Sequence, residues 1–345
     1  MKNRKMRVCF FVCLFVVSCA SVSWAVEVSS WSELEEALRD IGEDTLSDYV
    51  IDIVQDIVGP RTISHPSLPA IAKPLTIRGN GHAIDAGTVG LGSRRVFYVA
   101  EKGDATFIDL MIEGGNSIET GGGVYVERGR ARFVNCTISG NRSFGHGGGV
   151  AVVSADVVFE KCRIENNNAF QQGGGIFQEN GRLRFWKCAI SGNALFGDGG
   201  GVLVSNGDAE FIGCEIFGNR TFGNGGHGAG GGLLVSAASG VTVSFVDCAI
   251  YDNDAGHAGG GVCVRGDGSV DFTSCTIAGN RAAIEGGGVS VYDGHASFTS
   301  CTVTKNRGRS AGGLHVLGTV WLRGSIVAGN APDSNGGDAG VSDVL

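Results

Sequence analysis

A nine-residue motif, Phe-x-x-Cys-x-[Ile/Val]-x-x-Asn, occurs seven times in the 345-residue chain and limits its fold more than any other feature. Successive motif cysteines lie 26, 26, 26, 34, 27 and 26 residues apart. A motif that returns at a nearly fixed period of this length indicates a stack of structural repeats. The motif cysteines are Cys136, Cys162, Cys188, Cys214, Cys248, Cys275 and Cys301. The motif asparagines are Asn141, Asn167, Asn193, Asn219, Asn253, Asn280 and Asn306.

Each repeat contains three short stretches in which apolar residues alternate with other residues, and glycine-rich corners separate these stretches. This pattern predicts one rung of a parallel β-helix, in which equivalent residues of successive rungs stack about 4.8 Å apart. A helical-hairpin repeat is excluded, because each unit carries several glycines and many β-branched residues. We therefore predict an all-β fold, a right-handed parallel β-helix of 26-residue rungs over residues 49–330.

The repeated asparagines and cysteines predict two ladders inside the coil. An asparagine at a corner can hydrogen-bond backbone groups of its own rung and of the next, which favours burial of its side chain. Cysteine behaves as a small apolar residue in protein cores. The repeats lack the Cys-x-x-Cys spacing of metal sites, and stacked neighbours in register rarely offer the dihedral angle of a disulfide. We expect free, buried thiols and no metal or cofactor.

The first 25 residues have the features of an export signal. Four basic residues precede Val8–Val17, an apolar segment too short to span a bilayer. Two processing sites stay open: cleavage after Ala25, or attachment of a lipid to Cys19 at a lipobox-like segment. We expect a secreted or cell-surface protein whose contact with a membrane is limited to a lipid at Cys19.

The two ends of the predicted coil differ. Residues 26–48 contain a predicted helix over Trp31–Arg39, on which Leu34, Ala37 and Leu38 share one face. Such a helix would cover the open apolar end of the stack. Residues 331–345 form a tail rich in glycine and aspartate, without an evident cap.

The alternation of Gly-Gly-Gly-[Val/Ile/Leu], Phe-x-x-Cys and Gly-Asn over about Ala105–Asn330 resembles the repeats of the polymorphic outer-membrane protein family. The hallmarks of that family are Gly-Gly-Ala-[Ile/Leu/Val] and Phe-x-x-Asn, so cysteine and glycine here replace its asparagine and alanine. The resemblance implies a right-handed β-helix displayed at a bacterial surface. The family also ends in a transmembrane barrel, for which this sequence leaves no room before Leu345, so we do not expect self-transport.

Composition and motifs favour a non-catalytic binding or structural role. The formal net charge of −8 offers no general attraction to nucleic acid. The alternative is a secreted polysaccharide lyase or glycoside hydrolase, because many β-helices cleave polysaccharides. No acid–base pair recurs at one position of adjacent repeats. Three or more Asp, Glu, Arg or His side chains converging on one face would favour the enzyme.

Two sets of residues are candidate binding surfaces for a glycan or a surface protein, and the oligomeric state is not predicted. Basic residues crowd the early repeats, where they could dock an acidic glycan or simply form a solvated face. Apolar residues occupy the outward position after the Gly-Gly runs. That stripe could contact a partner, a second copy or a sugar ring, or be covered by the insertion Asn224–Ala229. The basic candidates are Arg132, Arg163 and Arg184; the apolar candidates are Tyr125, Phe177, Leu203 and Leu234.

Overall fold

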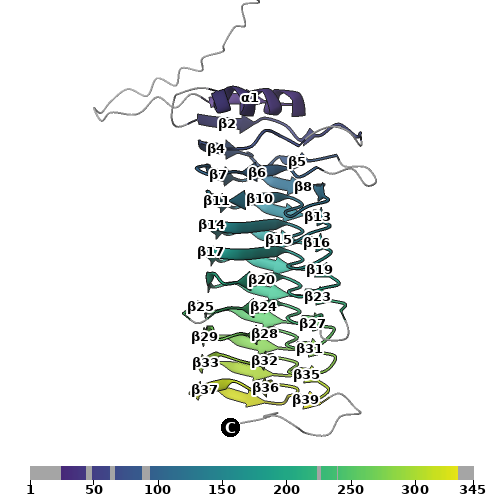
Figure 1. The fold of residues 1–345 in the computed structure, drawn as a ribbon, viewed down its shortest axis with the longest axis vertical. Helices are drawn as coiled ribbons and strands as arrows, with labels where there is room; N and C mark the ends of the chain where they lie inside the picture. The colour runs from purple at the N-terminus through teal and green to yellow at the C-terminus, as the bar shows by residue number, and fades with distance from the viewer. Residues whose placement is uncertain are drawn as a thin grey trace, which may run out of the picture.

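The computed structural model describes residues 25–43, 49–62, 67–87, 94–223, 227–238 and 240–332. The expected export signal up to residue 24, with Cys19, and most of the expected tail lie outside these ranges. The described chain coils into a tall stack of rungs with one helix at its N-terminal end (Figure 1). Three sheets run along the stack, and every pair of neighbouring strands is parallel, which gives the predicted parallel β-helix.

The largest sheet has 19 strands and forms one broad side of each rung. We call it sheet A. Its strands are β1 (Ala25–Val28), β2 (Tyr49–Ile53), β4 (Pro74–Arg78), β6 (Phe97–Val99), β7 (Asp104–Ile108), β10 (Val124–Glu127), β11 (Arg130–Val134), β14 (Val150–Glu160), β17 (Ile176–Trp186), β20 (Val202–Ser205), β21 (Asp208–Ile212), β24 (Leu233–Ser236), β25 (Thr242–Val246), β28 (Val262–Arg265), β29 (Ser269–Thr273), β32 (Val289–Val291), β33 (His295–Thr299), β36 (Leu314–Val316) and β37 (Thr319–Arg323).

The other two sheets have 11 and nine strands. We call them sheets B and C. Sheet B comprises β3 (Ile57–Val58), β5 (Ala83–Asp85), β8 (Met111–Glu113), β12 (Thr137–Ser139), β15 (Arg163–Glu165), β18 (Ala189–Ser191), β22 (Glu215–Phe217), β26 (Ala249–Tyr251), β30 (Thr276–Ala278), β34 (Thr302–Thr304) and β38 (Ile326–Ala328). Sheet C comprises β9 (Asn116–Ser117), β13 (Arg142–Ser143), β16 (Asn168–Ala169), β19 (Ala194–Leu195), β23 (Arg220–Thr221), β27 (Asp254–Ala255), β31 (Arg281–Ala282), β35 (Arg307–Gly308) and β39 (Ala331–Pro332).

The register between rungs places equivalent repeat residues beside one another. Phe133 of β11 pairs with Phe159 of β14, which pairs with Phe185 of β17. Their rings stack with centroids 4.9 Å apart and are fully buried or nearly so. Because alternate residues of a strand face opposite sides, one correct register buries the whole set of apolar side chains. The result is one continuous core that runs the length of the stack.

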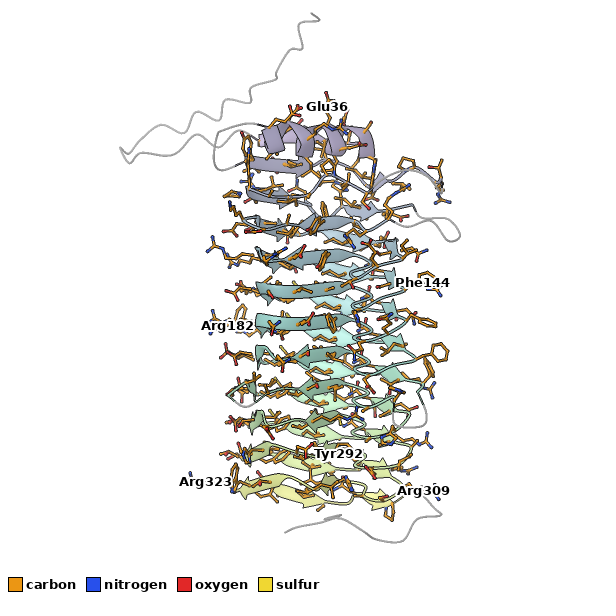
Figure 2. All side chains as sticks on the ribbon, in the orientation of Figure 1. Glu36, Phe144, Arg182, Tyr292, Arg309 and Arg323 are labelled. Carbon is orange, nitrogen blue, oxygen red and sulfur yellow. The ribbon has the colours of Figure 1, made fainter. Side chains whose placement is uncertain are left out.

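Helix α1 (Trp31–Glu43) covers the N-terminal end of the stack and is four residues longer than the expected helix. The Oγ of Ser30 accepts a hydrogen bond from the backbone N–H of Glu33, which caps the helix. Leu34 and Leu38 are buried in the main core, whereas Glu36 points away from the rungs (Figure 2). Among the described residues, no helix has the length and apolarity needed to cross a bilayer.

Candidate binding surfaces

The motif asparagines form a buried ladder at the corner between sheets B and C. Asn193 is fully buried, and its Nδ2 donates to the carbonyl of Ile164 at 2.9 Å and to Oδ1 of Asn219 at 2.9 Å. Its own Oδ1 accepts hydrogen bonds from the backbone N–H and the Nδ2 of Asn167. Each side chain thus links successive rungs, so this ladder is structural and unavailable to a ligand.

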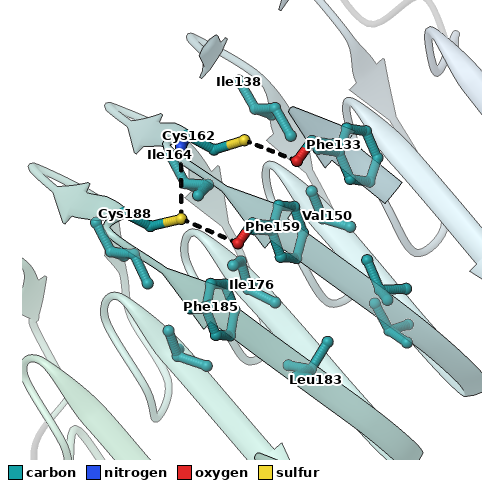
Figure 3. Close-up of a cluster of buried hydrophobic side chains, with 14 of the residues drawn as sticks. Phe133, Ile138, Val150, Phe159, Cys162, Ile164, Ile176, Leu183, Phe185 and Cys188 are labelled. Carbon is teal, nitrogen blue, oxygen red and sulfur yellow. Dashed lines mark hydrogen bonds between the residues drawn. The ribbon is translucent and has the colours of Figure 1, made fainter. Parts of the chain in front are cut away.

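The motif cysteines form a second buried ladder, and all seven are free thiols. Figure 3 shows two neighbours of this ladder, Cys162 and Cys188. The Sγ of Cys162 donates to the carbonyl of Phe133 at 3.3 Å, while the backbone N–H of Cys162 donates to Sγ of Cys188 at 3.4 Å. In the rung after Cys301, Ser325 takes the place of the cysteine. Its Oγ accepts a hydrogen bond from the backbone N–H of Cys301 and donates one to the carbonyl of Phe298. The ladder therefore uses the thiols as packed hydrogen-bonding groups.

The apolar stripe predicted as a binding surface is buried by the chain itself. Phe177, Leu203 and Leu234 are exposed by only 5%, 1% and 2%. They belong to a second, smaller core outside sheet A, against which the half-buried Tyr125 packs. The binding prediction is wrong for Phe177, Leu203 and Leu234, which the chain itself covers. Part of the cover comes from corners before the Gly-Gly runs: the ring of His146 stacks on Phe177 at 4.5 Å, and Ala229 of the insertion belongs to the same buried cluster. Residues 224–226 of the insertion lie outside the described residues.

One edge of the second core carries an ion pair. The side chain of Asp198 is 10% exposed and lies 3.4 Å from a guanidinium nitrogen of Arg265. Its Oδ1 also accepts backbone N–H groups of Gly228 and Ala229, both at 2.8 Å. The guanidinium of Arg265 lies over the ring of Tyr292, 5.5 Å from its centroid. These contacts hold the corner segment over the apolar stripe.

The ion pair continues into a second group of polar side chains. The hydroxyl of Tyr292 donates to the carboxylate of Glu285. His315 places Nδ1 3.7 Å from Oε2 of Glu285 and 3.2 Å from Oγ of Ser290. A catalytic Ser-His-Glu triad needs both ring nitrogens, one toward the serine and one toward the acid. Here one nitrogen faces both groups, and Ser290 is fully buried.

Four titratable side chains therefore lie in one connected group, namely Asp198, Arg265, Glu285 and His315. This arrangement meets the condition set above for the enzyme alternative. In the part of the chain that the structure describes, no group of three or more His, Cys, Asp or Glu side chains is arranged to hold a metal ion. The contacts of these groups with backbone and with one another fit a structural network that closes the second core.

Two of the three candidate arginines line an open groove of about 470 Å³ on the outer face of sheet A. Arg132 and Arg184 lie two rungs apart in one column, with Val158 between them. Nε and Nη2 of Arg132 each lie 3.0 Å from a different carboxylate oxygen of Glu160. Arg184 is held more loosely, with Nε 3.8 Å from Oε2 of Glu210.

An aromatic side chain that sequence reasoning did not select completes the groove. Trp186 is 39% exposed, and Nζ atoms of Lys161 and Lys187 lie 5.5 and 4.7 Å from its ring centroid. The lining itself holds two arginines and two glutamates, and the two lysines beside Trp186 add two positive charges at the edge of the groove. We call this site the Trp186 groove.

Arg163 does not belong to this site. It lies on β15 of sheet B, where its guanidinium pairs with Glu165 at 2.6 Å. The expectation of one cluster from all three arginines is therefore wrong. Arg163 follows a motif cysteine, whereas Arg132 and Arg184 precede a motif phenylalanine, so the repeat itself assigns them to different strands.

A row of exposed phenylalanines runs along the corner that follows sheet C. Phe170, Phe196 and Phe222 are exposed by 56%, 65% and 47%, and Phe144 is half-exposed. Each directly follows a sheet C strand: β13, β16, β19 or β23. We call these four residues the phenylalanine ladder. Sequence reasoning missed it, although each member stands three residues after a motif asparagine and an alignment of the repeats would have shown the column.

Comparison with known families agrees with this architecture. The family model described as "Right handed beta helix region" matches residues 95–260. The model described as "Putative pectate lyase-like adhesive domain" matches residues 25–144. Neither a curated protein nor a solved structure matches the chain. The coil and the two matches define a right-handed β-helix repeat protein, and the second match fits an adhesin-like protein displayed outside the cell.

Proposed function

We propose that this protein is an exported, surface-displayed adhesin-like β-helix that binds an acidic glycan in the Trp186 groove and does no chemistry on it. The N-terminal segment supports export. It would be processed either by cleavage after Ala25 or by attachment of a lipid to Cys19. The shared repeat pattern supports kinship with the polymorphic outer-membrane protein repeats. The observation that carries the binding role is a basic groove with an exposed tryptophan on an otherwise regular sheet.

The groove chemistry suits a chain that bears carboxylate or sulfate groups. Arginine presents a planar fork that binds such groups through two parallel hydrogen bonds. Arg184 contacts Glu210 only at 3.8 Å, so its donors can turn to a ligand at small cost. The part of the Trp186 ring that Lys161 and Lys187 leave exposed offers an apolar surface for a sugar ring. Because the groove is open along the sheet, it can bind an internal stretch of a polymer and does not need a free chain end.

Retention on immobilised heparin and on polygalacturonate tests this function. The double variant Arg132→Glu and Arg184→Glu should elute at clearly lower salt than wild type, because four units of charge change at the groove. Arg163→Glu is the matched control, since it reverses an exposed arginine on sheet B. Equal elution of the double variant and wild type would rule out the groove as the binding site.

The second candidate is a polysaccharide-active enzyme, favoured by the convergence of Asp198, Arg265, Glu285 and His315. A reducing-sugar assay of the purified chain on a panel of acidic and neutral polysaccharides separates the two candidates. The binding function predicts no product. Product that disappears in Glu285→Gln would establish the enzyme instead.

A further inference from the structure

The rings of the phenylalanine ladder are spaced differently from those in the core. Neighbouring centroids lie 6.4 Å apart from Phe144 to Phe170, 6.4 Å from Phe170 to Phe196 and 5.6 Å from Phe196 to Phe222. From Phe107 to Phe298, the buried rings of sheet A stack at 4.9 Å or less with nearly parallel planes. The outer rings are tilted by 30–49° to one another. The outer rings therefore overlap less than the core rings do, and the two central residues, Phe170 and Phe196, are 56% and 65% exposed to a ligand.

The size of this apolar surface limits its occupant. Aromatic side chains bury about 150–250 Å² each, so four that are roughly half exposed offer on the order of 400 Å². Patches of this size on a monomer are often functional. A stable pair of proteins needs about 800 Å² on each partner. The ladder is therefore too small and too narrow to hold a second copy of this chain by itself.

Backbone pairing argues against an extended peptide. A peptide that adds to a sheet needs a free strand edge for its main-chain hydrogen bonds. Next to the ladder, β16 pairs with β13 on one side and with β19 on the other, and β19 pairs in turn with β23. A ligand lying along the ladder crosses these strands and finds their backbone groups already paired.

Charged side chains contact the two ends of the phenylalanine ladder, whereas the residues beside its middle are uncharged. Arg142 lies over the ring of Phe144 at 4.8 Å, at one end. Arg220 lies over the ring of Phe222 at 5.1 Å, at the other end, and pairs with Asp254 at 2.7 Å. Beside the two central rings the half-exposed or exposed neighbours are uncharged: Asn168, Gln171, Ala194 and Gly197.

We propose that the phenylalanine ladder binds a neutral linear polysaccharide that runs parallel to the axis of the coil. The apolar faces of its sugar rings lie on Phe170 and Phe196, one sugar for each rung. Its hydroxyl groups stay in water or reach the side-chain amide of Gln171. A sugar chain suits this surface because it joins apolar ring faces to polar edges that need no buried partner.

This site is separate from the Trp186 groove. The groove lies on sheet A, whereas the ladder follows sheet C. Phe144 and Arg182, which is in the strand that carries Arg184, lie at opposite edges of the stack (Figure 2). The two sites can be tested independently, and the ladder does not depend on the proposed acidic-glycan function.

Native affinity electrophoresis tests the ladder in gels that contain hydroxyethyl cellulose, galactomannan or soluble starch, all uncharged. Wild type should be retarded by at least one of them, and Phe170→Ser with Phe196→Ser should weaken binding about tenfold. Trp321→Ser removes another exposed aromatic residue, 57% exposed and outside the ladder, and should bind as wild type. The proposal would be overturned if none of the three polymers retarded the wild-type protein, or if the double serine variant bound as tightly as wild type.

A second double variant tests the role of the aromatic faces. Phe170→Leu with Phe196→Leu keeps apolar side chains but removes the flat rings, so it should weaken polysaccharide binding about as much as the serine variant does. Full binding by the leucine variant would contradict sugar stacking. Both variants should keep wild-type thermal unfolding, wild-type sedimentation and wild-type retention on heparin. A change in sedimentation without a change in polysaccharide binding would assign the ladder to self-association and overturn the proposal.

Discussion

Asn193 shows what a single ladder residue contributes to the coil. Its side-chain amide makes four hydrogen bonds, to the backbone of Ile164, to the backbone and side chain of Asn167 and to Asn219. Asn193→Ala leaves these buried partners short of a hydrogen bond, so we expect a loss of about 3 kcal/mol in the free energy of unfolding. Urea denaturation measures it.

The neighbouring rung supplies the control for this substitution. Asn168 is only partly buried, and its Nδ2 makes one hydrogen bond, to the carbonyl of Ala194 at 2.9 Å. Asn168→Ala should cost about 1 kcal/mol or less. Equal losses for the two variants would show that the ladder amides contribute no more than an ordinary surface bond.

Cys263, in the second core, should make the stability of the protein depend on pH. Burial raises the pKa of this fully buried thiol to about 12, whereas a thiol in an unfolded chain has a pKa near 8.5. Its stabilising contribution is complete below pH 8.5. Above that pH the unfolded chain releases a proton that the folded chain keeps, so stability falls as pH rises towards 12. The expected slope is about 1.4 kcal/mol per pH unit.

Cys263→Ser isolates this effect. Serine already occupies the equivalent position of the next rung, where Ser290 pairs in register with Cys263. We expect the difference in unfolding free energy between wild type and variant to shrink by about 1.2 kcal/mol from pH 9 to pH 10, because only wild type holds a titrating thiol at this position. A difference that is independent of pH over this range would contradict a neutral buried thiol.

At the scale of the element, the corners decide how closely rungs can approach. A Cβ on Gly148 would collide with the carbonyl oxygen of Gly174 and lie 2.5 Å from the backbone of Asn168. These are backbone atoms that cannot turn aside, so Gly148→Ala should destabilise the coil by about 3 kcal/mol. A Cβ on Gly42 in α1 would meet nothing within 4 Å beyond the adjoining helix backbone, so Gly42→Ala should be neutral or slightly stabilising. Thermal unfolding compares the two, and similar melting temperatures would contradict the close approach.

The same elements show what the repeat predicts and where it stops. Motif spacing predicts strand register, and register alone decides that Phe133 and Asn193 face inward. The burial of Phe177 depends on His146, whose ring stacks on it from a corner. The alternation of residues along a strand does not predict the path of a corner. Sequence reasoning could treat the stripe only as outward-facing, since strand alternation says nothing about what covers an outer face.

The binding surfaces, too, were only partly predictable from the sequence. Charge alone singles out Arg132 and Arg184, but their separation from Arg163 needs the assignment of each residue to its sheet. Trp186 and the phenylalanine ladder are less conspicuous in the sequence than the glycine runs beside them. Single exposed aromatic residues carry little signal in a sequence, whereas stacking in register turns one repeat position into a continuous surface.

At the scale of the molecule, the two ends of the described coil are unequal. Helix α1 buries the N-terminal end under Leu34 and Leu38. At the other end of the described residues, Leu322 takes the place of the core phenylalanines and is only half-buried, and Ile326 is 55% exposed. A solenoid is held together by contacts between neighbouring rungs, so the rung with the weaker contacts opens first.

The thiol ladder can report this order of opening. Under native conditions Cys301, near the half-buried end, should react with maleimide at least about tenfold faster than Cys214 in the middle of the stack, because labelling requires local opening. Both thiols are buried in the closed state, so static exposure does not separate them. Peptide mass spectrometry after timed labelling measures each rate. Equal rates at Cys214 and Cys301 would mean that the coil opens only as a whole, in which case neighbouring rungs are too strongly coupled for the end to open alone.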